Sequence, residues 1–166
     1  VKVQDSNSTS LSGKTVKYRA MGTDFTLGET DDNGIARAEL FAGTYNMWTT
    51  VNYTNSGQRP VDITAGAAPD YIDYTFVATV VTMDFPGTIR YYAGGSNVKF
   101  TSPQAMFPGT YKFTFSKSGN TVTRELTIGD SPINDRFAIV ALKDSKGNGL
   151  EGGSVSYYAG KWENNV

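Results

Sequence analysis

The sequence repeats a short segment in which apolar and polar residues alternate. Val16-Lys17-Tyr18-Arg19-Ala20 returns as Ile89-Arg90-Tyr91-Tyr92-Ala93, and again as Val155-Ser156-Tyr157-Tyr158-Ala159. The shared tyrosines at 18, 91 and 157 are 73 and then 66 residues apart. These spacings exceed the roughly 20–50 residues of solenoid repeats. They predict small domains in tandem rather than single supersecondary units stacked in a row.

Alternation with period two is typical of β-strands with one buried face. In all three segments the apolar residues occupy the inward positions, and polar residues or a second tyrosine occupy the outward ones. A slip of one residue would turn every apolar side chain to water, so the three copies agree on one register. We therefore expect Tyr18, Tyr91 and Tyr157 to face a core.

Turn-forming residues separate the predicted strands. Asp31-Asp32-Asn33-Gly34 predicts a tight hairpin between strands over 25–27 and 35–40, because Asn-Gly tolerates positive backbone angles. Lys117-Ser118-Gly119-Asn120 predicts another hairpin in the middle copy. The pattern indicates an all-β chain of β-sandwiches. We divide it into a complete repeat over 1–77, a shortened repeat over 78–130 and a partial repeat over 131–166 that holds only the first two strands.

A second block recurs and carries a resemblance to a known family. Leu40-Phe41-Ala42-Gly43-Thr44-Tyr45 returns as Met106-Phe107-Pro108-Gly109-Thr110-Tyr111. Together with the turn over 30–34, it resembles carboxypeptidase-regulatory-like and Cna-B-type domains. The Tyr-Tyr-Ala-Gly at 91–94 and 157–160 also resembles tandem repeats of large bacterial or archaeal surface proteins. The resemblance implies immunoglobulin-like or prealbumin-like sandwiches and an extracellular, cell-surface location.

The chain departs from the Cna-B members that form an isopeptide crosslink. Those members place a lysine two residues before the opening aspartate, where this chain has Val3 and Leu142. Residues 46–54 also contain none of the carboxylates that the family's catalytic glutamate would supply. We therefore expect no internal Lys–Asn crosslink.

Composition narrows the function classes. The chain has no histidine and no cysteine, and 15 basic residues balance 16 acidic ones. Near-neutral charge argues against nucleic-acid and polybasic membrane partners, and no apolar run is long enough for a membrane span. Without a histidine shuttle or a thiolate, we expect neither an enzyme nor a cofactor. The chain starts at Val1 without a signal-peptide pattern, so we expect a processed or excised segment.

Two sets of residues are candidates for ligand binding. Asp31, Asp32 and Asn33 offer oxygens that Ca²⁺ could use, although aspartates in such turns more often bond their own backbone. The large aromatic candidates are Trp48, Tyr92, Tyr158 and Trp162, and alternation turns the first three outward. Exposed aromatics could form an interface, stiffen a sheet face or stack on surface glycans. Asn7 and Asn52 begin glycosylation sequons.

The partial third repeat leaves apolar side chains that two strands cannot cover. These candidates for strand donation are Phe137, Ile139, Val155 and Tyr157. An isolated hairpin is marginal in water, so this part needs a partner. It could be cut from a longer array, fold back onto the middle repeat, or insert into a neighbouring copy.

From these observations we predict a structural or adhesive segment of a surface protein. It would be a stalk, a fibre or a self-assembling filament subunit, and its partners would be neighbouring repeats or copies of itself. The alternative is a carbohydrate-binding module that uses its exposed aromatics.

Overall fold

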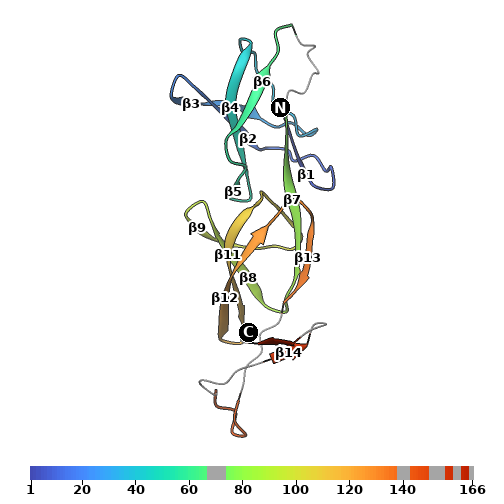
Figure 1. Cartoon of the computed structure of the whole chain (residues 1–166), viewed down its shortest axis with the longest axis vertical. Coiled ribbons are helices and arrows are strands. Elements are labelled where there is room, and N and C mark those ends of the chain that lie inside the picture. The colour runs from blue at the N-terminus through green and yellow to red at the C-terminus, as the bar shows by residue number, and fades with distance from the viewer. Residues whose placement is uncertain (67–73, 138–142, 150–155, 159–161, 165–166) are drawn as a thin grey trace.

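A computed structural model describes residues 1–66, 74–137, 143–149, 156–158 and 162–164. These residues form strands, turns and loops and contain no helix, so the all-β prediction is confirmed. Among them no helix exists that could cross a membrane. The chain is elongated, with two β-sandwich-like units stacked along its long axis (Figure 1).

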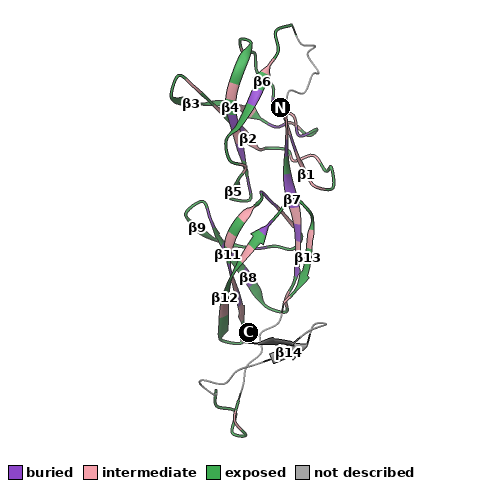
Figure 2. Cartoon of the chain, in the orientation of Figure 1, coloured by how far each residue is buried: buried purple, intermediate pink, exposed green. Residues whose placement is uncertain are grey.

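The first unit packs two sheets around one core. Its larger sheet is five-stranded and holds β2 (Thr15–Ala20), β3 (Thr23–Glu29), β4 (Gly43–Val51), β5 (Thr54–Asn55) and β6 (Arg59–Ile63). Opposite it, β1 (Lys2–Asp5) runs parallel to the first half of β7 (Thr75–Asp84). Val3, Val16 and Met47 are fully buried between these layers. Figure 2 shows the buried segments facing one another across the unit.

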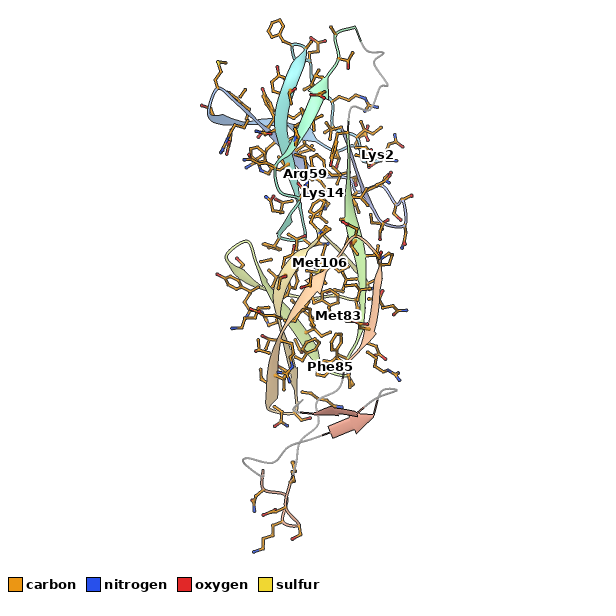
Figure 3. All side chains as sticks on the ribbon, viewed as in Figure 1. Lys2, Lys14, Arg59, Met83, Phe85 and Met106 are labelled. Carbon is orange, nitrogen blue, oxygen red and sulfur yellow. The ribbon has the colours of Figure 1, made fainter. Side chains whose placement is uncertain are left out.

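The second unit repeats this two-layer arrangement. One sheet has the order β12-β11-β8-β9, from β8 (Thr88–Ala93), β9 (Ser96–Lys99), β11 (Gly109–Lys117) and β12 (Asn120–Ile128). Facing it, the second half of β7 pairs with β10 (Gln104–Met106) and, in parallel, with β13 (Ile133–Arg136). Met83 and Met106 lie between the layers (Figure 3). A separate two-stranded ladder joins β14 (Ser156–Tyr158) and β15 (Trp162–Asn164).

Strand β7 belongs to both units. Phe76 and Ala78 are buried in the first core, whereas Val81 and Met83 are buried in the second. Both Ala78 and Thr79 are buried, so the inward-facing alternation shifts by one residue where the strand passes between the units. The predicted boundary near 77 falls within this strand, and the one near 130 falls between β12 and β13.

The predicted register holds in the first two repeats, but one predicted strand is wrong. Val16 and Tyr91 face their cores, and Lys17 and Arg90 face solvent. The segment 35–40 does not form a hairpin with β3. Instead Ile35 bridges Lys2 of β1, because the Asp31 turn carries the chain across to the opposite layer.

Three aspartates close turns of the same geometry. The Oδ1 atom of Asp31 accepts hydrogen bonds from the amides of Asn33 and Ile35, both at 2.9 Å. Asp5 accepts from the residues two and four positions later in the same way, and so does Asp144. The bond from Ile35, followed by the ion pair with Arg37, lowers the pKa of Asp31. Each of these carboxylates therefore stabilises the turn in which it lies, by accepting bonds from that turn's own backbone.

The second recurrent block folds alike in both units. The hydroxyl of Tyr45 donates to the carbonyl of Phe41 at 3.0 Å, and the hydroxyl of Tyr111 donates to the carbonyl of Phe107 at 2.8 Å. A tyrosine that bonds back to the chain a few residues upstream is a hallmark of immunoglobulin-like sandwiches, where it is called a tyrosine corner. The repeat seen in the sequence thus fixes the entry into β4 and into β11.

Gly34 is the turn residue whose replacement we expect to cost most. Its φ is +72°, and a Cβ there would collide with the carbonyl oxygen of Val3. Gly34→Ala should lower the unfolding free energy by about 2 kcal/mol or more, in urea titrations followed by fluorescence. Gly13→Ala is the matched control, because Gly13 has a φ of +65° but open space around it. It should cost about 1 kcal/mol. Equal losses in the two variants would contradict the collision.

Candidate functional site: the interface between the two units

One phenylalanine of the second unit completes the core of the first. Phe107 lies in the loop between β10 and β11, yet it packs in the cluster that contains Val51, Phe76 and Ala78. It is 2% exposed. Ala105 also packs against this first core. The two units therefore share apolar surface rather than meeting through a solvated linker.

A hydroxyl at the end of the first unit anchors the backbone of Phe107. The Thr54 hydroxyl donates to the carbonyl of Val51 at 2.6 Å and accepts from the amide of Phe107 at 2.9 Å. Thr54 is itself fully buried. Buried polar groups need such partners, because an unpaired amide here would cost about 1–3 kcal/mol. The Thr54 hydroxyl thus provides a partner for the backbone amide of the buried Phe107.

A polar chain runs beside this contact. The Asn52 side chain donates to the carbonyl of Ala105 at 3.0 Å, and the Asn52 carbonyl accepts from the Tyr91 hydroxyl at 2.5 Å. Gln104 completes the chain by donating to the same hydroxyl at 2.6 Å. Burial raises the pKa of Tyr91, as it does that of Tyr111. These phenols stay neutral donors at physiological pH, which keeps the interface uncharged.

The Asn52–Tyr53 turn is shaped for close approach. Both residues have positive φ, +46° and +63°, which is unusual for an aromatic residue such as Tyr53. Its carbonyl oxygen lies 3.3 Å from the position that a Cβ on Gly94 would take. On the other side of the interface, Ser6 accepts from the amide of Val80 at 2.9 Å. Contacts therefore flank β7 where it crosses between the units.

This geometry bears on the sequon at Asn52. Its amide nitrogen, the atom that would carry a glycan, is already donating to Ala105. The Thr54 hydroxyl of the same sequon is buried against Phe107. A glycan on Asn52 would therefore be attached to an atom that also bonds across the interface. Asn7, by contrast, lies in an exposed turn.

The aromatic candidates lie apart from one another. Trp48 is on the outward face of β4, as predicted, but it is half-buried beside its cross-strand partner Lys17. Tyr92 is on the outward face of β8 in the other unit and is 57% exposed. Tyr158 and Trp162 are cross-strand partners in the β14–β15 ladder.

Tyr92 borders a shallow hollow on the second unit. The hollow has a volume of about 460 Å³ and is lined by Tyr92, Asn97, Lys112, Thr114 and Thr123. Lys112 and Asn97 are the direct cross-strand neighbours of Tyr92. An aromatic ring surrounded by amide, ammonium and hydroxyl groups is a surface on which a sugar ring could stack and bond.

Among the predicted strand donors, Phe137 contacts its own chain. Its ring stacks on Phe115 with centroids 4.6 Å apart, next to the pair formed by Phe115 and Phe85 at 5.3 Å. The preceding strand β13 closes the second unit by pairing with β7. Tyr157 lies in β14 opposite Glu163. Ile139 and Val155 lie outside the described residues.

Of the calcium candidates, Asp31 already bonds to protein donors. Both carboxylate oxygens of Asp31 accept hydrogen bonds, one from two backbone amides and the other from Arg37 at 2.7 Å. Asp32 and Asn33 are exposed. In the part of the chain that the structure describes, no three acidic, histidine or cysteine residues gather closely enough to hold a metal ion.

Sequence reasoning missed the residues of the interface. Asn52 and Thr54 were interpreted only as a sequon, and Gln104 carried no pattern at all. Phe107 and Phe41 hold the same position in the recurrent block. The block itself therefore did not indicate that their surroundings differ. The one available signal for this interface was a turn at the end of a strand, which Asn52 and Tyr53 form.

Comparison of the chain with family models, with curated proteins and with solved structures gave no match.

We expect Phe107→Ala to weaken the first unit, although the residue belongs to the second. Large-to-small changes at a buried phenylalanine cost about 3–5 kcal/mol. Amide exchange should therefore accelerate at Met47, Thr49 and Val51 of β4, in the core that Phe107 completes. Phe41→Ala is the matched control, since Phe41 is 90% exposed and should leave exchange unchanged. Faster exchange restricted to the second unit would contradict the shared core.

Proposed function

We propose that the chain is a non-enzymatic structural segment of an extracellular surface protein, built as tandem immunoglobulin-like or prealbumin-like repeats. Its task would be to hold attached parts at a fixed distance and orientation. The observation that carries this proposal is the interface, in which strand β7 contributes to both cores and Phe107 of the second unit is buried in the core of the first. A spacer requires such a joint, whereas units on a flexible linker would move independently.

The repeat itself is supported by matching geometry in the two units. Each has a tyrosine corner at the start of its long central strand, from Tyr45 in β4 and Tyr111 in β11. In each unit a first strand also runs parallel to a last strand, β1 with β7 and β7 with β13. The last strand of one unit thus continues as the first strand of the next, and no linker residues intervene.

The position of β13 favours a stalk over strand exchange. The segment from Ile133 to Phe137 covers the second core of the same molecule, with Ile133 and Phe137 packed against it. A strand donated to a neighbour would leave this place open. A filament held together by that segment would therefore have to displace it from its own chain.

A fixed joint predicts a narrow distance distribution between the units. The chain has no cysteine, so Arg59→Cys with Arg124→Cys would place one spin label on the exposed side of each unit. The distribution should be as narrow as that of a pair within the first unit, Thr23→Cys with Arg59→Cys. A markedly broader distribution would refute the spacer. Light scattering on the same samples reports oligomers, which would favour the filament.

A second candidate function is glycan binding at Tyr92, favoured by the hollow beside it. Sugar rings stack on exposed aromatic faces, and the surrounding amide, ammonium and hydroxyl groups could orient one. Trp48 is less suited to this role, because it is half-buried. This candidate is compatible with a stalk that also adheres.

The glycan candidate predicts loss of binding on removal of one ring. On a glycan array, binding by the full chain should fall about tenfold or more in Tyr92→Ala, which removes a stacking contact of about 1.4 kcal/mol or more. Trp48→Ala should bind like the parent. Unfolding curves of both variants provide the check on folding. An array on which the parent chain binds nothing would eliminate this candidate.

A further inference from the structure

The interface between the units has a counterpart at the opposite end of the first unit. Phe41 occupies the same place in its block as Phe107, and its carbonyl accepts the same bond from a tyrosine hydroxyl. Their exposures are opposite, since Phe107 is 2% exposed and Phe41 is 90% exposed. Phe107 is buried in the core of the neighbouring unit, whereas the side chain of Phe41 is exposed to solvent.

The strand directions place Phe41 far from the interface. Strand β4 begins at Gly43, two residues after Phe41, and ends at Val51, next to the Asn52 turn that contacts the second unit. Nine extended residues span about 27 Å. Phe41 therefore lies at the end of the first unit that is away from the second unit, whereas Phe107 lies at the end of the second unit that contacts the first.

A second apolar side chain lies at the same end. Strand β2 is antiparallel to β4, with Arg19 opposite Asn46, so the Met21-Gly22 turn after β2 is near the start of β4. Met21 is 99% exposed. The equivalent turn of the second unit is Gly94-Gly95, and its residues have similar positive φ angles. That turn is in the interface, where Tyr53 approaches Gly94.

We propose that Phe41 and Met21 form a docking surface for the hairpin end of another β-sandwich unit of this kind, which precedes Val1 in the same polypeptide. This inference rests on the proposed function and names the partner at one end of the spacer. The preceding unit would receive Phe41 in its core, as the first unit receives Phe107. Its last strand would run on into β1.

The start of β1 fits this continuation. Val1 and Val3 are buried in the first unit, as Thr79 and Val81 are buried at the corresponding places in β7. The nitrogen of Val1 donates to the carbonyl of Ala36 at 3.0 Å. A peptide nitrogen at this position retains one N–H for the same bond. The bond from Val1 to Ala36 is therefore compatible with a residue placed before Val1.

The unit that docks at Phe41 must differ in one respect from the end of the first unit that contacts Gly94. Gly94 lets the Asn52–Tyr53 turn come close, whereas Met21 places a long side chain at that point. The partner's turn must leave room for this side chain and pack against it. A copy of the first unit therefore fits best on a chain in which Met21 is replaced by glycine.

The test extends the full 166-residue chain with a second copy of residues 1–78 placed directly before Val1, with and without Met21→Gly in the original chain. The added copy lacks Phe107, so Phe41 must complete its core. In at least one fusion, amides of the added copy equivalent to Met47, Thr49 and Val51 should be protected. Phe41→Ser in the original chain should reduce that protection of the added copy roughly 100-fold or more. In the unextended chain the same substitution should change nothing.

Three results would overturn the proposal. The added copy could stay unprotected in both fusions, or it could be protected equally with Phe41 and with Ser. The unextended chain could also form oligomers that Phe41→Ser abolishes, which would assign the surface to a second molecule instead. The label distances across the existing interface do not depend on Phe41, so failure here leaves the spacer proposal standing, whereas a broad label distribution would count against the spacer itself whatever the fusions show.

Discussion

The shared strand β7 constrains the whole molecule. Its first half supplies Phe76 and Ala78 to one core, and its second half supplies Val81 and Met83 to the other. A one-residue slip would expose apolar side chains in both units at once. The strand also pairs with β1 in one unit and with β10 and β13 in the other. The register of each unit is therefore tied to that of its neighbour.

Sharing a core helps units of this size. Domains of about 60 residues bury a smaller fraction of their surface on folding than larger domains do, and are marginally stable alone. Phe107 adds a large buried side chain to the first unit without lengthening that unit's own sequence. The cost is that the first core is incomplete until the second unit is in place. Stability and relative orientation thus come from the same contacts, which suits a spacer better than a pair of independent binding modules.

The sequence predicted what depends on local pattern. Alternation over 16–20 and 89–93 identified strands and their buried faces, and Ser118-Gly119 identified a hairpin with positive φ at both residues. It failed for 35–40, where alternation suggested a strand but the chain crosses between layers. It also could not separate Phe41 from Phe107. Both carbonyls accept the same tyrosine bond, but only Phe107 has a neighbouring core to enter, which no local pattern records.

The two hairpin ends are not interchangeable, and this gives the stack a direction. The end of the first unit buries Val51 and Thr54, which seat Phe107 and bond its amide. At the matching places, the β11–β12 hairpin has Lys117 and Asn120, and both are exposed. Near this hairpin, the core of the second unit is covered instead by the stacked rings of Phe115 and Phe137. A phenylalanine of another unit inserted beside Lys117 would contact a charged, hydrated side chain and not an apolar surface. The contact between these two units is therefore specific to their ends, and the residues at strand termini determine which units can be neighbours.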